Sequence, residues 1–443
     1  MKNIQLVSDS YLCSNCGACS VICHKNAIDF RWSSVGRLYA SINDNCVNCG
    51  NCLKVCPSLD YHQLHTTFSD KYIGVIKNVY IGKSTNLQCF LNAQSGGFAT
   101  GVLLHLFEQK QIDAAIVCQM ECGRIPLVNP VIVNDKCQLF NTQKSCYTPV
   151  PLLKILKEIK DYKSIAIVGL PCHLEGVAEL QKTTKRFDNI KFKVGLICDR
   201  TECNGIQEII KDYTGFESFK IHWRQKYDKQ NDKYNYQEAP IVAVSDKGEE
   251  KVLPRHYRMA LKDMFTPPRC RVCWDKLNVF ADITCGDPWR LPDIDKKKGE
   301  SLIIVRSLLG QSVVDAMSVN GELVKKSIDN NAPLRSQLIE ERRSQVAAYS
   351  QAFSCMSTSI SSYLLSQNDD IKVDCCVQID RLKGFVNLER MSYRQIVSEA
   401  NKNIALHEAK MKQQQSIFYR LKRRILKFIM WYENCIIRCR NKQ

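Results

Sequence analysis

Long apolar runs are absent from the 443-residue chain, and none approaches the roughly 18 to 20 residues that a membrane-spanning helix needs. The first residues, MKNIQLVSDSYLCSN, lack the apolar stretch and the small-residue cleavage site of a secretory signal. Charged residues make up 24%, which does not indicate disorder, and the hydrophobic share of 45% supports a sizeable core. We therefore expect a cytoplasmic protein of about two to four domains at roughly 150 residues each.

Cysteine, by contrast, is abundant. The sequence contains 24 cysteines, and eight of them fall in the first 60 residues, where an even spread would place about three. A reducing cytosol does not sustain structural disulfides. Clustered cysteines in such a compartment therefore predict metal ligands or redox groups.

Two cysteine runs near the N-terminus, at residues 13–23 and 46–57, share the spacing C-x2-C-x2-C-x3-C. At this spacing three cysteines bind one [4Fe-4S] cluster and the fourth binds the neighbouring cluster. The predicted ligands are Cys13, Cys16, Cys19 and Cys56 for one cluster and Cys46, Cys49, Cys52 and Cys23 for the other.

Zinc is the main alternative for these cysteines, but zinc sites usually consist of two C-x2-C pairs with a long spacer. Gly17 and Gly50 follow the second cysteine of each run, where the backbone must bend and present N–H groups to sulfur. His24 replaces the proline expected after Cys23, and that position is not a ligand. Residues 5–60 resemble bacterial two-cluster ferredoxins.

Downstream of this part, apolar strand patterns alternate with helical ones. An example is the strand pattern at 165–168, followed by a helix from about Leu174. The alternation predicts a mixed α/β region. The pattern also predicts a strand at 72–76 and an amphipathic helix at 151–159, and it becomes helical from about residue 345.

Three further motifs carry cysteines in the middle of the chain. In GLPCH the cysteine follows a strand and a proline, at a helix N-terminus, which lowers a thiol pKa and favours a thiolate ligand. The others are GLICDRTEC, at another strand end, and CRVCWD with the ITCGD that follows it. The cysteines concerned are Cys172, Cys198, Cys203, Cys270, Cys273 and Cys285. The alternative for each one alone is a buried small hydrophobe.

A family resemblance rests on these motifs together with two upstream ones. In order along residues 70–310 they read QSGGFATGVLLHLFEQKQIDAAIV, KSCYTPV, GLPCHLEGV, GLIC and CRVCWDKLNVFADITCGD. They resemble successive motifs of the family of coenzyme F-420 hydrogenase/dehydrogenase beta subunits. The resemblance implies FAD, at least one further [4Fe-4S] cluster, and electron transfer to or from a deazaflavin hydride carrier.

The resemblance also implies where these cofactors bind. The best ligands for a third [4Fe-4S] cluster are Cys172, Cys198, Cys270 and Cys273, with Cys203 and Cys285 as alternates. For FAD, Ser95, Gly96 and Gly97 form a turn into a helix whose N-terminus favours a pyrophosphate. An ordinary turn is the alternative interpretation of that tripeptide.

The remaining candidate residues lie in two of the family motifs. Lys144, Ser145 and Tyr147 belong to KSCYTPV and are candidates for contact with the cofactor phosphate or ring, the alternative being an exposed loop. Asp287 of the CGD motif is a candidate polar partner in the site, the alternative being a turn aspartate. No catalytic acid or base can be named from the sequence.

These observations predict an iron–sulfur flavoprotein oxidoreductase. Electrons would pass from reduced ferredoxin or another redox partner protein through the clusters and FAD to an organic acceptor, or in reverse. The alternative is an electron-transfer subunit of a larger redox complex, without a substrate site of its own. The formal charge of +17 is not gathered into any nucleic-acid-binding motif, so no nucleic acid partner is expected.

The predicted division of the chain has four parts. Residues 1–62 form a ferredoxin-type domain, 70–150 and 151–345 the N-terminal and C-terminal α/β regions of the family, and 346–443 a helical extension. Residues 416–443 combine eight Lys or Arg with one acid and repeat apolar residues at helical spacing. They predict peripheral contact with an anionic membrane surface on its cytoplasmic face, the alternative being packing on the protein itself.

Overall fold

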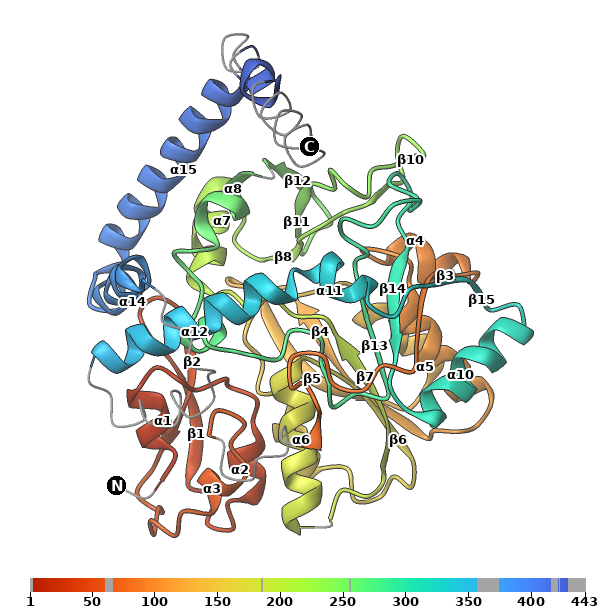
Figure 1. Cartoon of the computed structure of the whole chain (residues 1–443). Helices are drawn as coiled ribbons and strands as arrows, with labels where there is room; N and C mark the ends of the chain where they lie inside the picture. The colour runs from red at the N-terminus through yellow and green to blue at the C-terminus, as the bar shows by residue number, and fades with distance from the viewer. Residues whose placement is uncertain are drawn as a thin grey trace, which may run out of the picture.

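The computed structural model describes residues 3–59, 67–184, 186–254, 256–356, 374–415, 421 and 423–428 (Figure 1). A small N-terminal unit lies beside a large central sheet, and helices from the last quarter of the chain cross over both (Figure 1). This arrangement confirms the mixed α/β class that the strand and helix patterns predicted.

The N-terminal unit contains one hairpin and three short helices. Its elements are α1 (Gln5–Asp9), α2 (Ala18–Ile22), β1 (Ile28–Trp32), β2 (Leu38–Ile42) and α3 (Asn51–Lys54). Strands β1 and β2 pair antiparallel. Gly17 and Gly50 precede α2 and α3 with φ of +99° and +76°. That left-handed backbone suits glycine and confirms the two bends expected from the cysteine runs.

The central sheet has eight strands in the order β15-β3-β14-β13-β7-β6-β4-β5. Their bounds are β3 (Asn78–Ser84), β4 (Ala114–Glu121), β5 (Leu127–Val133), β6 (Ile165–Gly169), β7 (Ile190–Leu196), β13 (Ile283–Gly286), β14 (Ser301–Val305) and β15 (Leu323–Ile328). The four inner strands β13, β7, β6 and β4 are parallel to one another, and the outer pairings are antiparallel.

Helices cover both faces of this sheet, as expected where the inner strands are parallel. One face packs on α5 (Phe98–Glu108) and α10 (Leu308–Val319). The other packs on α6 (Pro171–Thr184) and the 3₁₀ segment η3 (Leu152–Lys157). Alternate residues of β6 divide between the two cores, Ile165 and Ile167 on the α6 side and Ala166 on the α5 side.

A smaller sheet and several short helices complete the α/β part. The strands are β8 (Phe219–His222), β9 (Tyr227–Asp228), β10 (Lys233–Tyr234), β11 (Ile241–Ser245) and β12 (Glu250–Leu253). The sheet order is β12-β11-β8, and β9 and β10 form a separate pair. The short helices are α4 (Leu87–Asn92), η2 (Lys136–Thr142), α7 (Gly205–Thr214), α8 (His256–Leu261) and α9 (Pro268–Arg271).

The last quarter of the described chain is helical. Its elements are α11 (Ala332–Gln337), α12 (Ile339–Cys355), α14 (Cys376–Leu388) and α15 (Tyr393–Gln415). Tyr349 and Phe353 of α12 pack into the core of the N-terminal unit. Ile396 and Ile404 of α15 pack with α7 and β8, after which α15 runs away from the molecule (Figure 1).

No helix among the described residues is long and apolar enough to cross a membrane. Most of the segment 416–443 lies outside the described residues, which include only 421 and 423–428 of it. Ile425 and Phe428 are exposed in that helical piece. Contact of the segment with a membrane surface stays a prediction, as do the four domain bounds.

Two expected elements differ in the structure. Residues 72–73 form a turn and 74–76 have no regular structure, and Arg306 Nη1 donates to the carbonyls of Ile73 (2.9 Å) and Val75 (2.8 Å). Residues 152–157 form a 3₁₀ helix rather than an α-helix. Near its start, the Leu153 N–H donates to the carbonyl of Cys16 in the N-terminal unit at 2.9 Å.

The N-terminal unit docks on the α/β part through very close backbone contacts. Gly36, in the β1–β2 turn, accepts a hydrogen bond from the Asn204 N–H at 2.8 Å. A Cβ at Gly36 would lie 2.4 Å from the Gly205 nitrogen. Beside it, Arg37 forms a two-pronged ion pair with Glu389 after α14, with a shorter Nε–Oε1 distance of 2.6 Å. Both side chains of that pair are largely buried.

Replacement of Gly36 by alanine tests this docking. Gly36 has φ of +76°, so the variant suffers both left-handed strain and a backbone clash with α7. We expect the free energy of unfolding to fall by about 2 to 4 kcal/mol, measured by calorimetry on the iron-loaded chain.

Gly215→Ala is the matched control, because Gly215 has φ of +67° but nothing within 4 Å of its added Cβ. It should lose only the strain contribution of about 1 kcal/mol. Equal losses in the two variants would contradict close docking at Gly36.

Candidate functional site

The first set of thiols, Cys13, Cys16, Cys19 and Cys56, lies inside the N-terminal unit, and all four side chains are buried. The N–H groups of Asn15 and Ala40 point at the Cys13 sulfur, each at 3.4 Å. Burial raises the pKa of Cys16 to about 11 and that of Cys19 well above its usual value, and the neighbouring thiols add to both shifts. Thiolates gathered so closely need a compensating cationic centre.

The second set, Cys23, Cys46, Cys49 and Cys52, lines one small cavity of about 20 Å³. The Ala27 N–H points at the Cys23 sulfur at 3.3 Å. Burial raises the pKa of Cys52 to about 11, with Cys49 and Cys23 among the contributors. The fold thus gathers the eight cysteines into the two groups that their spacing predicts.

The central set, Cys172, Cys198, Cys270 and Cys273, comes from three separate parts of the chain. Cys172 lies in the first turn of α6, Cys198 follows β7, and the other two lie at α9 and just after it. Burial raises the pKa of Cys172 well above its usual value, and the thiols of Cys16, Cys273, Cys198 and Cys270 raise it further. The side chains of this set are therefore neighbours.

The two alternates are placed differently. Cys203 is fully buried in an apolar core with Ile206 and Phe265, although it lies near Cys270. Cys285 packs in the core beneath α5. Neither is among the largest contributors to the raised pKa of Cys172 or Cys198. The geometry therefore favours the central set, and the ligand assignment itself remains a proposal.

Among the described residues, no three or more His, Cys, Asp or Glu side chains are arranged to hold a single metal ion. A [4Fe-4S] cluster takes one thiolate on each of its four irons, so its ligands surround a volume rather than one point. Three groups of four thiols, of which the first is buried and the others are partly exposed, fit such clusters in their donor type and number.

The first and central sets lie close to each other. A Cβ at Gly176 on α6 would lie 3.7 Å from the Cys16 sulfur and 3.4 Å from the Ala18 Cβ. Helix α6 begins next to Cys172, whose pKa is also raised by Cys16. Cys52 of the second set likewise raises the pKa of Cys19 in the first. The three sets thus run in the order second, first, central.

A cavity of about 970 Å³ adjoins the central set, because Cys198 lines it. We call it the cationic cavity, since its wall carries eight basic and three acidic side chains. The basic residues are Lys144, Arg200, Arg224, Arg258, Lys262, Lys276, Arg290 and Arg342. The acidic residues are Asp199, Asp287 and Glu341. This excess of positive charge favours an anionic ligand.

Two of the three residues of the predicted Ser95-Gly96-Gly97 turn line this cavity. Ser95 and Gly97 line the cavity, and Gly97 begins α5 with φ of +77°. Gly96 instead packs on the central sheet, where its added Cβ would lie 2.5 Å from the Gly82 oxygen. Its missing side chain therefore serves the packing of the turn on the sheet.

The KSCYTPV residues Lys144, Ser145 and Tyr147 all line the cationic cavity. The Lys144 ammonium lies 3.0 Å from His222 Nδ1 and 2.8 Å from Gln225 Oε1. Burial lowers the pKa of Lys144 to about 8. Lys144 and Tyr147 have φ of +84° and +53°, an uncommon backbone for such side chains. Strain of this kind is typical of functional sites.

Asp287 is a polar partner at the cavity wall rather than an isolated turn residue. Arg224 Nη1 donates to its Oδ2 at 2.6 Å, and the Tyr236 hydroxyl donates to Oδ1 at 2.8 Å. The guanidinium of Arg224 lies 5.2 Å and 5.1 Å from the ring centroids of Tyr236 and Trp289. Asp287 thereby orients Arg224.

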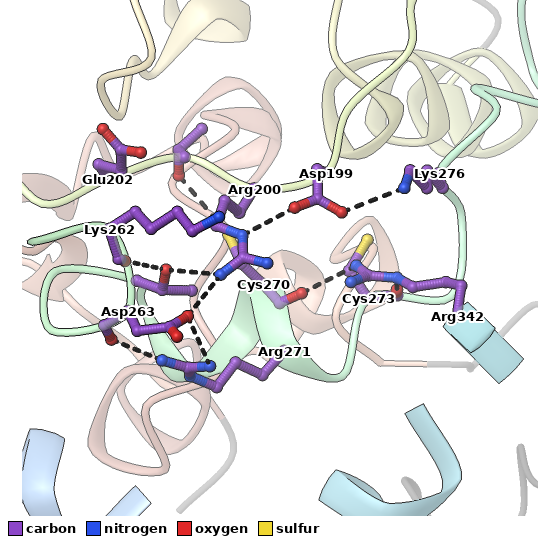
Figure 2. Close-up of polar contacts among 12 residues, drawn as sticks. Asp199, Arg200, Glu202, Lys262, Asp263, Cys270, Arg271, Cys273, Lys276 and Arg342 are labelled. Carbon is purple, nitrogen blue, oxygen red and sulfur yellow. Dashed lines mark hydrogen bonds and ion pairs between the residues drawn. The ribbon is translucent and has the colours of Figure 1, made fainter. Parts of the chain in front are cut away.

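The sequence reasoning missed the ion network beside the central set (Figure 2). Arg200 donates to Asp199 at 2.8 Å and to Asp263 at 2.9 Å, and Lys276 lies 3.2 Å from Asp199. Burial disfavours the charge on Asp199, but Arg200, Lys276 and Arg342 hold its pKa well below the usual range. The adjacent Asp199 and Arg200 in the sequence GLICDR could have indicated an ion pair at this place.

Arg342 of α12 joins this network to the central set. It donates from Nε to the Cys273 carbonyl and from Nη2 to the Cys270 carbonyl, both at 2.9 Å (Figure 2). Its partners are about seventy residues away in sequence, so no local pattern could have indicated the contact.

The site and fold are those of an iron–sulfur electron-transfer protein, and the comparisons agree. The 4Fe-4S dicluster domain matches residues 12–59. The N-terminal and C-terminal domains of the coenzyme F420 hydrogenase/dehydrogenase beta subunit match residues 79–157 and 162–331. The chain therefore belongs to the family of coenzyme F420 hydrogenase/dehydrogenase beta subunits, as its motifs predicted.

Similar proteins come from methanogens. The coenzyme F420-dependent sulfite reductase of Methanocaldococcus jannaschii is 25% identical over 362 residues, which cover 76% of this chain and about half (52%) of that protein. One component of the F(420)H(2) dehydrogenase of Methanosarcina mazei is 23% identical over 77% of this chain and 92% of its own length. These relatives support an oxidoreductase.

A solved structure shares the fold. A chain of the F420-reducing [NiFe] hydrogenase complex from Methanosarcina barkeri superposes with a TM-score of 0.50 at 19% identity. The match covers 64% of this chain and 94% of that one.

Removal of the Asp287 charge tests its role in orienting Arg224. Asp287→Asn leaves the mostly buried Arg224 without its anionic partner, so we expect a loss of about 3 kcal/mol in the free energy of unfolding. The measurement is calorimetry of the loaded chain.

The control is Asp315→Asn, which breaks the more exposed pair with Lys325 and should cost about 0 to 1 kcal/mol. Replacement of the whole pair by Arg224→Met with Asp287→Leu should recover part of the loss. An unchanged Asp287→Asn variant would show that Arg224 needs no anchor.

Proposed function

We propose that this protein is an iron–sulfur flavoprotein oxidoreductase that passes electrons between [4Fe-4S] clusters, FAD and an organic acceptor or hydride carrier. The observation that carries the proposal is the place of the central set. Helix α6 carries Cys172 of this set and contacts Cys16 of the first set. Cys198 of the central set is part of the cavity wall. Redox groups and a ligand-sized cavity are therefore contiguous.

The two N-terminal sets would accept or deliver single electrons at the surface of the molecule. Cys49 of the second set is exposed, whereas the first set is buried against α6. A redox partner protein, such as reduced ferredoxin, would therefore meet the second set first. The direction of transfer depends on the partner and the acceptor.

The cationic cavity has the size and charge for a nucleotide cofactor. Its volume lies at the upper end of the roughly 300–1,000 Å³ typical of ligand pockets. Bound FAD would exchange hydride as a two-electron unit with the acceptor and single electrons with the clusters. Lys144 and the N-terminus of α5 beside Ser95 and Gly97 would hold its phosphates.

The names of the relatives include coenzyme F420, so that carrier is the first acceptor to test. The alternative function is an electron-transfer subunit of a larger complex, without a substrate site of its own. Flavin reduction by the purified chain, combined with turnover only in the presence of a partner protein, would favour that alternative.

The central set is tested by its iron. The full-length chain purified anaerobically should hold about twelve irons, and the variant Cys270→Ala with Cys273→Ala about eight, because one cluster has four irons. Iron analysis and the loss of one electron paramagnetic resonance signal measure this.

The matched controls are Cys203→Ala and Cys285→Ala, which should keep about twelve irons because these thiols lie in apolar cores. About eight irons in the unaltered chain would contradict a third cluster. A loss of about four irons in Cys203→Ala would show that Cys203 is a ligand of the central cluster.

The flavin is tested by release and by pH. Denaturation of the anaerobically reconstituted chain should release about one equivalent of FAD. Because the pKa of Lys144 is about 8, its ammonium attracts phosphate at pH 7 and loses its charge by pH 9. FAD retention should therefore fall as the pH rises through about 8.

The Lys144→Gln variant should bind FAD more weakly and lose this pH dependence. Lys136→Gln, at an exposed lysine paired with Glu108, should behave as the unaltered chain does. Release of neither FAD nor FMN would leave only the electron-carrier function.

A further inference from the structure

Arg269 spans the space between the first and central thiol sets. It lies in α9 and directly precedes Cys270, and it is only 5% exposed. Its Nη2 donates to the Pro57 carbonyl at 3.0 Å, and Pro57 directly follows Cys56. One end of this residue therefore belongs to the central set and the other reaches the backbone of the first.

The surroundings of the guanidinium are negatively charged when the thiols are ionised. Arg269 directly precedes Cys270 of the central set, and its Nη2 reaches the residue that follows Cys56 of the first set. The guanidinium therefore lies beside thiols of both sets. Arginine stays protonated in proteins, so a permanent positive charge lies buried between them.

The Nε–H group of Arg269 is buried without a hydrogen-bond partner among the described residues. A buried unpaired donor is costly unless an anion or another acceptor lies close by. The thiolates and sulfides of bound clusters would be such acceptors.

We propose that Arg269 is a positioning residue for electron transfer between the first and central clusters, whose reduced states its charge stabilises. Reduction adds one negative charge to a cluster, and a nearby cation in a low-dielectric contact favours that state. The inference rests on the proposed function, because it requires a cluster at the central set. The contacts of Arg269 lead to Cys270 of the central set and to the residue after Cys56 of the first set, so the second set serves as an internal reference.

Loss of the charge should shift the first and central clusters together. At a fixed solution potential we expect Arg269→Gln to lower the ratio of reduced to oxidised cluster about tenfold at both, equivalent to 59 mV for one electron. The ratio at the second cluster should stay unchanged. Arg269→Lys keeps the charge while losing the two-pronged shape, so its ratios should stay within about twofold of the unaltered chain.

The matched control is Arg271→Gln. Arg271 lies on the same short helix and is similarly buried, but it donates to the Tyr349 hydroxyl at 2.9 Å and the Asp263 carbonyl at 2.6 Å. Both acceptors are oxygens of residues outside the thiol sets. Arg271→Gln should leave the ratio of reduced to oxidised cluster unchanged at all three clusters.

The experiment is an anaerobic potentiometric titration of the iron-loaded full-length chain, followed by electron paramagnetic resonance. The Cys270→Ala, Cys273→Ala variant assigns the central signal, and iron analysis confirms equal loading. A tenfold shift at two clusters in Arg269→Gln, absent in Arg269→Lys and Arg271→Gln, supports the proposal.

Four results would overturn it. If Arg269→Gln holds about twelve irons and its ratios of reduced to oxidised cluster are unchanged, Arg269 has no such role. If the unaltered chain holds only about eight irons, there is no central cluster, and the proposed function fails with it. Equal shifts in Arg269→Gln and Arg269→Lys would show that shape and not charge matters. An equal shift in Arg271→Gln would show a general effect of disturbing α9.

Discussion

Cysteine ligands bring negative charge into a protein interior that disfavours it, and the rest of this structure is arranged around that constraint. Burial raises the pKa of Cys16 and Cys172, so these thiols would be neutral without a metal centre. The chain compensates with N–H groups aimed at sulfur, as at Cys13, and with buried guanidinium groups. Arg342 is bonded to the C-x2-C backbone for this reason.

The same constraint explains why the N-terminal unit is docked rather than tethered. A Cβ at Gly17 would lie 2.7 Å from the Lys154 nitrogen, and the Cys16 carbonyl accepts a hydrogen bond from Leu153. Such contacts leave little room for water between the N-terminal unit and the α/β part. Exclusion of water strengthens every charge interaction there, including that of Arg269.

The cationic cavity continues this electrostatic organisation on the other side of the central set. Asp199 and Asp287 pair with cations of the cavity wall, but they offset only part of its charge, because the wall carries eight basic and three acidic side chains. What remains is a wall with an excess of positive charge. The relatives of this chain carry different names. Under the proposed function, this cavity is where the acceptor would be selected.

The sequence alone determined what depends on local spacing. The eight N-terminal cysteines, the two left-handed glycines and the strand–helix alternation around β6 and α6 all follow from residues that are neighbours in the chain. The family membership was also readable from short motifs in order.

Only the tertiary structure decided the contacts between distant segments. Residues 72–76 have a strand pattern, but Arg306 binds the carbonyls of Ile73 and Val75. The Leu153 N–H likewise binds the carbonyl of Cys16 in the N-terminal unit. The links from Arg342 to Cys270 and from Arg269 to Pro57 join residues far apart in sequence. Side chains that pair through space leave no periodicity in the sequence, so folding alone could bring these charges to the thiols.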